Sequence, residues 1–184
     1  MRVLNEYKGT LETTKGFYEV FKECCSTDLS RQSMNYVYYD KEESSFVATD
    51  GRRLIVHTDD TFEDIKGSGF YEAVKIGKKF KLVPVNFEGQ FPNWQRVLPD
   101  ESTYISVCIG EYSSFGISGN IAKDSNILCK IIRKLDCCIN IEFITKILKH
   151  VNEVEIYHHP EDKNKAILFS IDDRTKYIIM PMMD

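Results

Sequence analysis

The sequence predicts an α+β fold built from two similar halves, each with one helix followed by three strands. An amphipathic helix at residues 11–25 precedes three strand-like segments that end near residue 57. The same order recurs at residues 140–182, over nearly the same length. Such repetition indicates that one structural unit is used twice. We therefore expect a pseudo-twofold repeat, with both helices side by side on one face of a continuous sheet.

The first half begins with a short predicted strand at residues 2–8, followed by the helix at residues 11–25. The apolar side chains of this helix share the spacing of one helix face, and they are Phe17, Val20, Phe21, Cys24 and Cys25. β-Branched and aromatic residues then predict three strands, at residues 35–40, 45–49 and 53–57. Asp50 and Gly51 form the turn between the last two, because glycine accepts a positive φ at no steric cost.

The second half starts at Asn140, which is an N-cap for a helix at residues 140–151. Its apolar positions have helical spacing, and they are Ile141, Ile144, Leu148 and Val151. Three strands are predicted to follow, at residues 153–158, 166–171 and 176–182. Turn-forming residues at 160–164 connect the first two of these strands.

The middle of the chain is less regular. Strands are predicted at residues 72–76 and 80–87, and Pro84 places the second at an edge or a bulge because proline cannot donate to the ladder. The segment 91–99 is bracketed by prolines and is predicted to be extended. Further on, the sequence predicts a hairpin and then a helix, at residues 104–109, 114–118 and 121–136.

Length and composition are typical of one globular domain. The 184 residues are enough for a substantial core, and 42% of them are hydrophobic and 28% charged. We expect a single domain over residues 1–184, with halves at about 1–60 and 136–184 and a middle segment at about 61–135. No apolar run approaches the roughly 18 residues of a membrane span, and the N-terminus has no signal-peptide core. These features predict a cytoplasmic protein with no membrane partner.

Charge and cysteine usage exclude several classes of function. The net charge of −4 disfavours indiscriminate nucleic-acid binding, although it allows a local basic face. None of the six cysteines forms a Cys-x-x-Cys pair, so we expect small buried thiols and no zinc site. His158 and His159 are adjacent on a predicted strand and point to opposite faces, so they do not share a metal. The sequence has no phosphate-binding loop, nucleophile elbow or metalloprotease motif, and it predicts no enzyme, metal or cofactor.

Three stretches, in this order, resemble signature segments of the bacterial DNA polymerase III beta subunit, the sliding clamp. They are Val47–Leu54, Phe91–Pro99 and Tyr177–Met182. The first half of the chain resembles the first half of the middle clamp domain, and residues 136–184 resemble the second half of the last domain. The second half of the middle domain and the first half of the last domain are shortened in this chain. It implies a DNA-clamp-like fold and a non-enzymatic binding module.

In the family, these segments build a pocket between the middle and last domains that captures short linear peptides of replication and repair proteins. Carried over by motif, the pocket positions are Thr49, Gly51, Arg52, Arg53, Leu54, Pro92, Val97, Asn140, Phe143, Ile178, Ile179, Met180, Pro181 and Met182. Apolar side chains would accept the anchors of an extended peptide, and arginines would donate to its carbonyls or acidic side chains. Leu54, Val97, Ile179 and Met180 are expected to converge on one groove.

Departures from the family pattern concern peptide specificity. Arg52 stands where histidine is common, Phe143 where tyrosine is common, and Met183 where arginine is common. The competing interpretation is that the pocket positions only complete a sheet edge and the core. Pocket and core residues have the same chemistry, so the sequence leaves both interpretations open.

The resemblance also implies loose contact between helices and double-stranded DNA. The basic residues that would supply it are Lys123, Lys130, Arg133, Lys134, Lys146 and Lys149. A single domain cannot encircle DNA, so a ring would require a homo-oligomer with closing contacts. An ordinary solvated helix face is the alternative. Two rival functions stay open as well: a monomeric adaptor or decoy without a DNA role, and an enzyme whose site the sequence hides.

Overall fold

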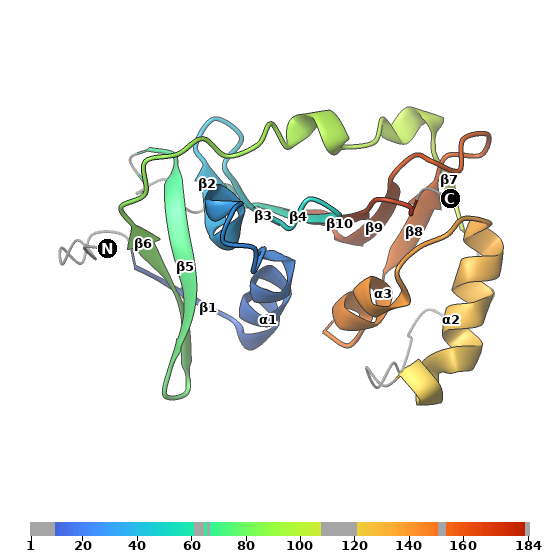
Figure 1. Ribbon diagram of the computed structural model, residues 1–184, viewed down its shortest axis with the longest axis horizontal. Helices are drawn as coiled ribbons and strands as arrows, with labels where there is room; N and C mark the ends of the chain where they lie inside the picture. Colours follow the sequence, from blue (N-terminus) through green and yellow to red (C-terminus); the bar gives the residue numbers. More distant parts are fainter. Residues whose placement is uncertain (1–9, 61–64, 66, 108–120, 151–153, 183–184) are drawn as a thin grey trace. The chain divides into compact units, whose positions relative to one another are not determined.

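The computed structural model describes residues 10–60, 65, 67–107, 121–150 and 154–182 (Figure 1). The chain divides into two compact units, residues 1–94 and 95–184. The boundary lies within the middle segment of the sequence, so that this segment contributes strands to the first unit and a helix to the second. The single domain remains a prediction.

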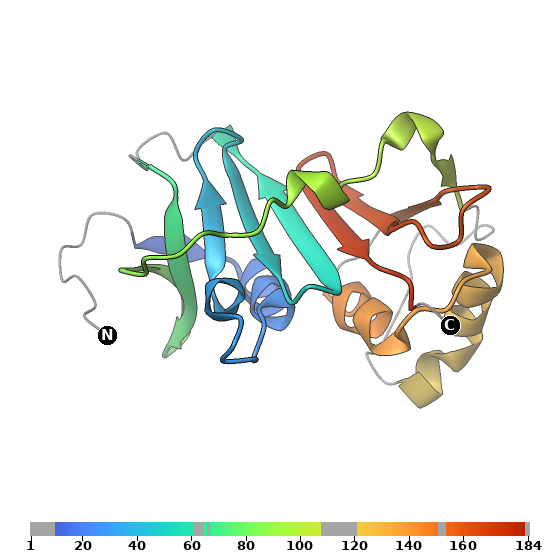
Figure 2. The same ribbon diagram turned by 45° about the horizontal axis from the view of Figure 1, so that its top comes forward.

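The first unit is an antiparallel sheet with one helix packed against it. Its elements are β1 (Leu11–Thr13), α1 (Lys15–Cys24), β2 (Val37–Asp40), β3 (Ser45–Thr49), β4 (Arg53–Thr58), β5 (Gly69–Ile76) and β6 (Lys79–Val85). The strand order is β1-β6-β5-β2-β3-β4, and each pairing is antiparallel. α1 contacts β3, β4, β5 and β6. The strands stand side by side in Figure 2.

The second unit contains the same series of one helix and three strands as the first, preceded by a short strand and a further helix. After a 3-10 turn at Gln95–Val97 and another at Glu101–Thr103, its elements are β7 (Ile105–Ser106), α2 (Ile121–Leu135), α3 (Ile141–Leu148), β8 (Glu155–His158), β9 (Ile167–Asp172) and β10 (Thr175–Ile179). The strand order is β10-β9-β8-β7, again antiparallel. The series α1-β2-β3-β4 and α3-β8-β9-β10 confirm the repeat of one helix and three strands.

Side-chain caps define where the two repeated helices begin. Thr14 accepts a hydrogen bond from the Phe17 N–H at 3.2 Å through Oγ1, and the Asn140 side chain accepts one from the Glu142 N–H at 2.9 Å. Each bond satisfies a backbone donor that lacks a partner within the helix. The cap at Asn140 confirms the predicted start of α3. The cap at Thr14 corrects the first helix, which starts at Lys15 because residues 11–13 pair with β6 as a strand.

Aromatic residues fill the core of the first unit and also its opposite sheet face. Phe21, Tyr39 and Phe46 are buried, and the Tyr39 and Phe46 rings lie 4.8 Å apart. The segment after β6 adds Phe91, whose ring stacks on Tyr38 at 4.8 Å, and Trp94, whose Nε1 donates to Asp40 at 3.0 Å. This segment is therefore anchored to β2.

The structure corrects two further details. β6 is not an edge strand, because β1 pairs with it at Phe80–Leu82. Pro84 lies two residues further along and is opposite Tyr71 of β5. The segment 91–99 is not extended throughout, because residues 95–97 form a 3-10 turn. The predicted strands at 2–8 and 114–118 lie outside the described residues.

The hydrogen bond between Trp94 and Asp40 should stabilise the first unit measurably. Asp40→Ala leaves the indole N–H, in a side chain that is 6% exposed, without this acceptor, and we expect a loss of about 1–3 kcal/mol in the free energy of unfolding. Asp40→Asn keeps an acceptor oxygen and should lose much less. Urea unfolding followed by the emission of Trp94, the single tryptophan, measures both variants. Equal losses of unfolding free energy in the two variants would show that the acceptor oxygen does not stabilise the unit.

Candidate functional site

The turn between β3 and β4 is held by an internal network of hydrogen bonds. Thr49 Oγ1 donates to the Arg53 carbonyl at 2.7 Å and accepts from the Gly51 N–H at 3.0 Å. One carboxylate oxygen of Asp50 accepts from the N–H groups of Arg52 and Arg53, at 2.9 and 3.1 Å. Gly51 has φ +86°, which other residues rarely adopt. The first motif therefore folds as a rigid turn rather than a mobile loop.

Arg53 belongs to the framework of this turn. Its side chain is 7% exposed, its Nε lies 2.9 Å from Asp50 Oδ2, and Nη2 donates to the Glu23 carbonyl at the end of α1. Nε and Nη2 therefore already serve the turn and the helix, and the expectation that Arg53 offers donors to a peptide stays a prediction. Arg52, the next residue in the turn, is exposed.

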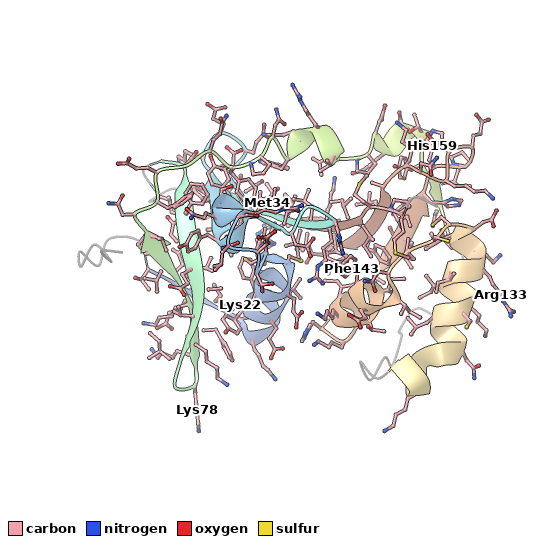
Figure 3. The ribbon with its side chains drawn as sticks, viewed as in Figure 1. Lys22, Met34, Lys78, Arg133, Phe143 and His159 are labelled. Carbon is pink, nitrogen blue, oxygen red and sulfur yellow. The ribbon has the colours of Figure 1, made fainter. Side chains whose placement is uncertain are left out.

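Two residues outside the motifs lie beside this turn. Arg31 Nη1 donates to the Asp50 carbonyl at 3.1 Å, and a Cβ at Gly51 would come within 2.6 Å of that nitrogen and 4.0 Å of the Met34 sulfur. Met34 is labelled in Figure 3. Both come from the connection between α1 and β2. No local signal in the sequence indicates either residue, because the contact between Arg31 and Asp50 joins positions that are 19 residues apart.

The other motif positions of the first unit differ in exposure. Leu54 is 3% exposed and packs within the unit, while Pro92 is half-buried in the segment that follows β6. Thr49 is also buried, at 8% exposed. Of the positions in this unit, Gly51 and Arg52 are the exposed ones.

In the second unit, the last motif is divided between core and surface. Ile178 and Ile179 are buried in β10, whereas Met180 is 39% and Met182 is 55% exposed. The Met182 N–H donates to the Cys138 carbonyl at 2.7 Å, which fastens this segment to the loop between α2 and α3. The strand predicted at residues 176–182 ends earlier, because β10 stops at Ile179.

Three further motif positions lie elsewhere in the second unit. Val97 is 40% exposed in its 3-10 turn, Asn140 caps α3, and Phe143 is half-buried (Figure 3). The Phe143 carbonyl accepts a hydrogen bond from the Tyr177 hydroxyl at 3.1 Å. Convergence of the motif positions on one groove stays a prediction.

The basic residues of α2 gather on one side of that helix. Lys123, Lys130 and Lys134 are exposed and share the spacing of one helical side, whereas Leu128, Ile131 and Leu135 are buried. Arg133, also exposed, is labelled on α2 in Figure 3. Lys149 is exposed just after α3, and Lys146 is half-buried in its last turn.

The cysteines differ from the expectation of buried thiols. Cys24 is buried and Cys25 half-buried, and burial raises the pKa of both thiols, that of Cys25 to about 12. Cys129 and Cys138 are exposed instead, because one lies on the outer side of α2 and the other in the loop after it. Cys108 lies outside the described residues.

An open hollow of about 950 Å³ lies beside that loop. Its lining comes from the end of α2, the loop after it, the turn between β8 and β9, and Met182. Within the described ranges, no three histidine, cysteine or acidic side chains are grouped as metal ligands would be. No described helix has the length and apolar character needed to cross a membrane.

The fold that these units define is that of a DNA sliding clamp. Among solved structures, DNA polymerase III subunit beta of Borrelia burgdorferi, in complex with a natural product, matches with a TM-score of 0.61 and 16% identity. The sliding clamp of Bacillus subtilis matches with a TM-score of 0.64 and 12% identity, and that of Pseudomonas aeruginosa, bound to griselimycin, with 0.56 and 14%. Each match confirms the α+β clamp-like fold.

These matches cover all of this chain but only part of each clamp. The covered share is 66% of the Borrelia and Bacillus proteins and 68% of the Pseudomonas protein, so the chain spans just under two thirds of the first two. No family model and no curated protein matches the sequence. The likeness is therefore one of fold.

The strained position of Gly51 gives a test of the turn. Gly51→Ala must hold a Cβ at φ +86°, which should cost about 1–2 kcal/mol of stability. Gly67→Ala is the matched control, because no atom lies within 4 Å of the added Cβ and its φ is not in the strained region. Urea unfolding of both variants measures the difference. Equal stability would contradict a turn that requires glycine.

Proposed function

We propose that the chain is a non-enzymatic, clamp-like binding module that captures short linear peptides of replication and repair proteins. The observation that supports this best is the exposure of motif positions within a sliding-clamp fold. Val97, Met180 and Met182 are apolar yet 40%, 39% and 55% exposed. Val97 belongs to the second motif, and Met180 and Met182 belong to the last. Exposed apolar side chains mark a binding site where they gather in one patch, which is what the resemblance predicts for these positions.

The chemistry of these positions suits an extended peptide. Methionine has a flexible, polarisable side chain that adapts to different apolar anchors. The exposed Arg52 guanidinium provides donors for carbonyl or carboxylate oxygens, and Arg31, 50% exposed beside the same turn, is a second such group. We propose these residues, together with the exposed apolar ones, as the peptide contacts.

The expected affinity is modest. Each fully buried apolar anchor contributes about 1.5–3 kcal/mol, and the entropy lost on ordering the peptide offsets part of it. A dissociation constant in the micromolar range, about 1–100 μM, is therefore the expected scale. Such weak contacts would let one surface serve several partners in turn.

Met180→Lys tests the peptide site. The substitution adds a charge at a side chain that is 39% exposed, so the fold should survive while binding falls at least about tenfold. Titration of a fluorescent clamp-binding peptide measures the loss, and Ile76→Lys, at a 60% exposed apolar residue of the β5–β6 hairpin, is the matched control. Absence of saturable binding by the wild type up to roughly millimolar concentration would refute the proposal.

Association with double-stranded DNA is the second proposal, and the basic side of α2 favours it. Contacts limited to phosphates would be weak and would decrease with salt. The triple variant Lys130→Glu, Arg133→Glu, Lys134→Glu should abolish retention on DNA at low salt. Retention equal to that of the wild type would reject this face.

The mass in solution separates the two roles of the module. A closed homo-oligomer supports sliding on DNA, whereas a monomer supports an adaptor or decoy that keeps the peptide site alone. Light scattering across a range of protein concentrations makes this distinction.

A further inference from the structure

The hairpin of β5 and β6 carries a concentration of positive charge that the proposed sites do not use. Lys75, Lys78, Lys79 and Lys81 lie close together in sequence, and no acidic residue occurs from Ala73 to Phe87. The whole chain has a net charge of −4, so this stretch differs sharply from its average. Lys75, Lys78 and Lys79 are exposed and Lys81 is half-buried.

This hairpin extends beyond the neighbouring strand. β2 pairs with β5 only at Gly69–Tyr71, whereas β6 pairs with β5 from Phe70 to Ile76. Past Tyr71, β5 is paired with β6 alone among the described residues. Figure 1 shows the hairpin reaching past α1, and Figure 3 shows Lys78 at its end. β1 pairs with β6 at Phe80–Leu82, so the hairpin is two-stranded only at its end, from Ile76 to Lys79. This end, together with the flanking pair of Lys75 and Phe80, is called the ribbon below.

The ribbon keeps a net positive charge despite the acidic residues next to it. The acidic residues of β1, β5 and β6 are Glu12 and Glu72, against three lysines in these strands and Lys78 in the turn. Glu12 Oε1 lies 2.8 Å from Lys79 Nζ and 3.8 Å from Lys81 Nζ. Neither of these short contacts involves Lys75 or Lys78. Lys75 lies instead over the Phe80 ring, 5.6 Å from its centroid, on the side of the ribbon that faces α1.

The two sides of the ribbon follow from its register. Lys75 pairs with Phe80, so these two side chains share one face, and Phe80 contacts Tyr18 of α1. Lys79 and Lys81 point to the other face, where Glu12 of β1 also lies. Lys78 occupies the turn with Gly77, whose φ of +60° allows it to be tight. Positive charge is thus present at the end and on both faces.

We propose that this ribbon, residues 75–80, contacts the phosphates of double-stranded DNA. Its two strands lie about 4.8 Å apart, and the major groove, about 12 Å wide, admits a two-stranded ribbon. Lysines at its end and faces then reach phosphates on either side of the groove. The contacts carry no base recognition, because lysine meets a phosphate as a point charge. The inference rests on the proposed association with DNA and assigns it a second element, in the other unit from α2.

The salt dependence of binding tests the ribbon. Lys75→Gln with Lys78→Gln removes two positive charges at exposed positions. Each lost phosphate contact makes the slope of the logarithm of the binding constant against the logarithm of the salt concentration less steep by about 0.9. We expect the slope, measured by fluorescence anisotropy on a labelled duplex, to become less negative by about 2. The matched control is Lys165→Gln with Arg96→Gln, two exposed cations elsewhere, which should leave the slope unchanged. Lys75→Arg with Lys78→Arg should restore the wild-type slope.

The outcomes distinguish failure of the ribbon proposal from failure of the proposed function. An unchanged slope in the ribbon variant, while the α2 triple variant loses binding, would overturn the ribbon and leave DNA association standing. Equal slopes for the ribbon variant and its matched control would overturn it too. No binding of the duplex by the wild type would overturn both DNA proposals, whereas peptide titration would still report on the peptide site. Circular dichroism of each variant checks that the fold is retained.

Discussion

The first motif depends on one buried ion pair. Arg53 is 7% exposed, pairs with Asp50 and donates to the carbonyl of Glu23, so a single guanidinium joins the β3–β4 turn to the end of α1. A buried charge without its partner is strongly destabilising, commonly by about 3–5 kcal/mol. The turn and the end of α1 therefore depend on both partners of this pair being present. Arg52, the neighbouring residue, is exposed.

The last motif shows how one short segment serves both the core and the surface. Ile178 and Ile179 are held in β10 by pairing with β9, and their side chains are buried. The chain leaves the sheet after Ile179, and the hydrogen bond from Met182 to Cys138 keeps the departing segment close to the unit. The exposed methionines are thus attached at both ends of a short span. Such attachment lowers the entropy that binding would cost.

Local signals in the sequence predicted most elements well. The β3–β4 hairpin, the cap at Asn140 and the repeated helix-and-strands order came from turn chemistry, capping and periodicity, which act between near neighbours. The sequence could not predict features that depend on distant contacts. Arg53 resembles any surface arginine until the fold brings the Glu23 carbonyl to it. Pro84 suggests an edge strand, but β1 pairs with the same strand at Phe80–Leu82.

The candidate site divides in the same way. The motif resemblance named its positions, but exposure separates those that face solvent from those that pack. Leu54 and Ile179 are as apolar as Val97, yet only Val97 is at the surface. Arg31 and Met34 carry no motif and enter only through their contact with the turn. Apolar character alone does not distinguish a binding position from a core position.

The uneven distribution of two chemical groups makes the units separately observable. The single tryptophan, Trp94, is buried in the first unit, and the thiols of that unit are kept protonated by burial. Among the described cysteines, the exposed ones are Cys129 and Cys138, and both belong to the second unit. A maleimide dye would therefore attach to the second unit while the tryptophan remains in the first. Energy transfer from Trp94 to the dye would report a change in the distance between the units on binding. The measurement would use only residues that the chain already contains.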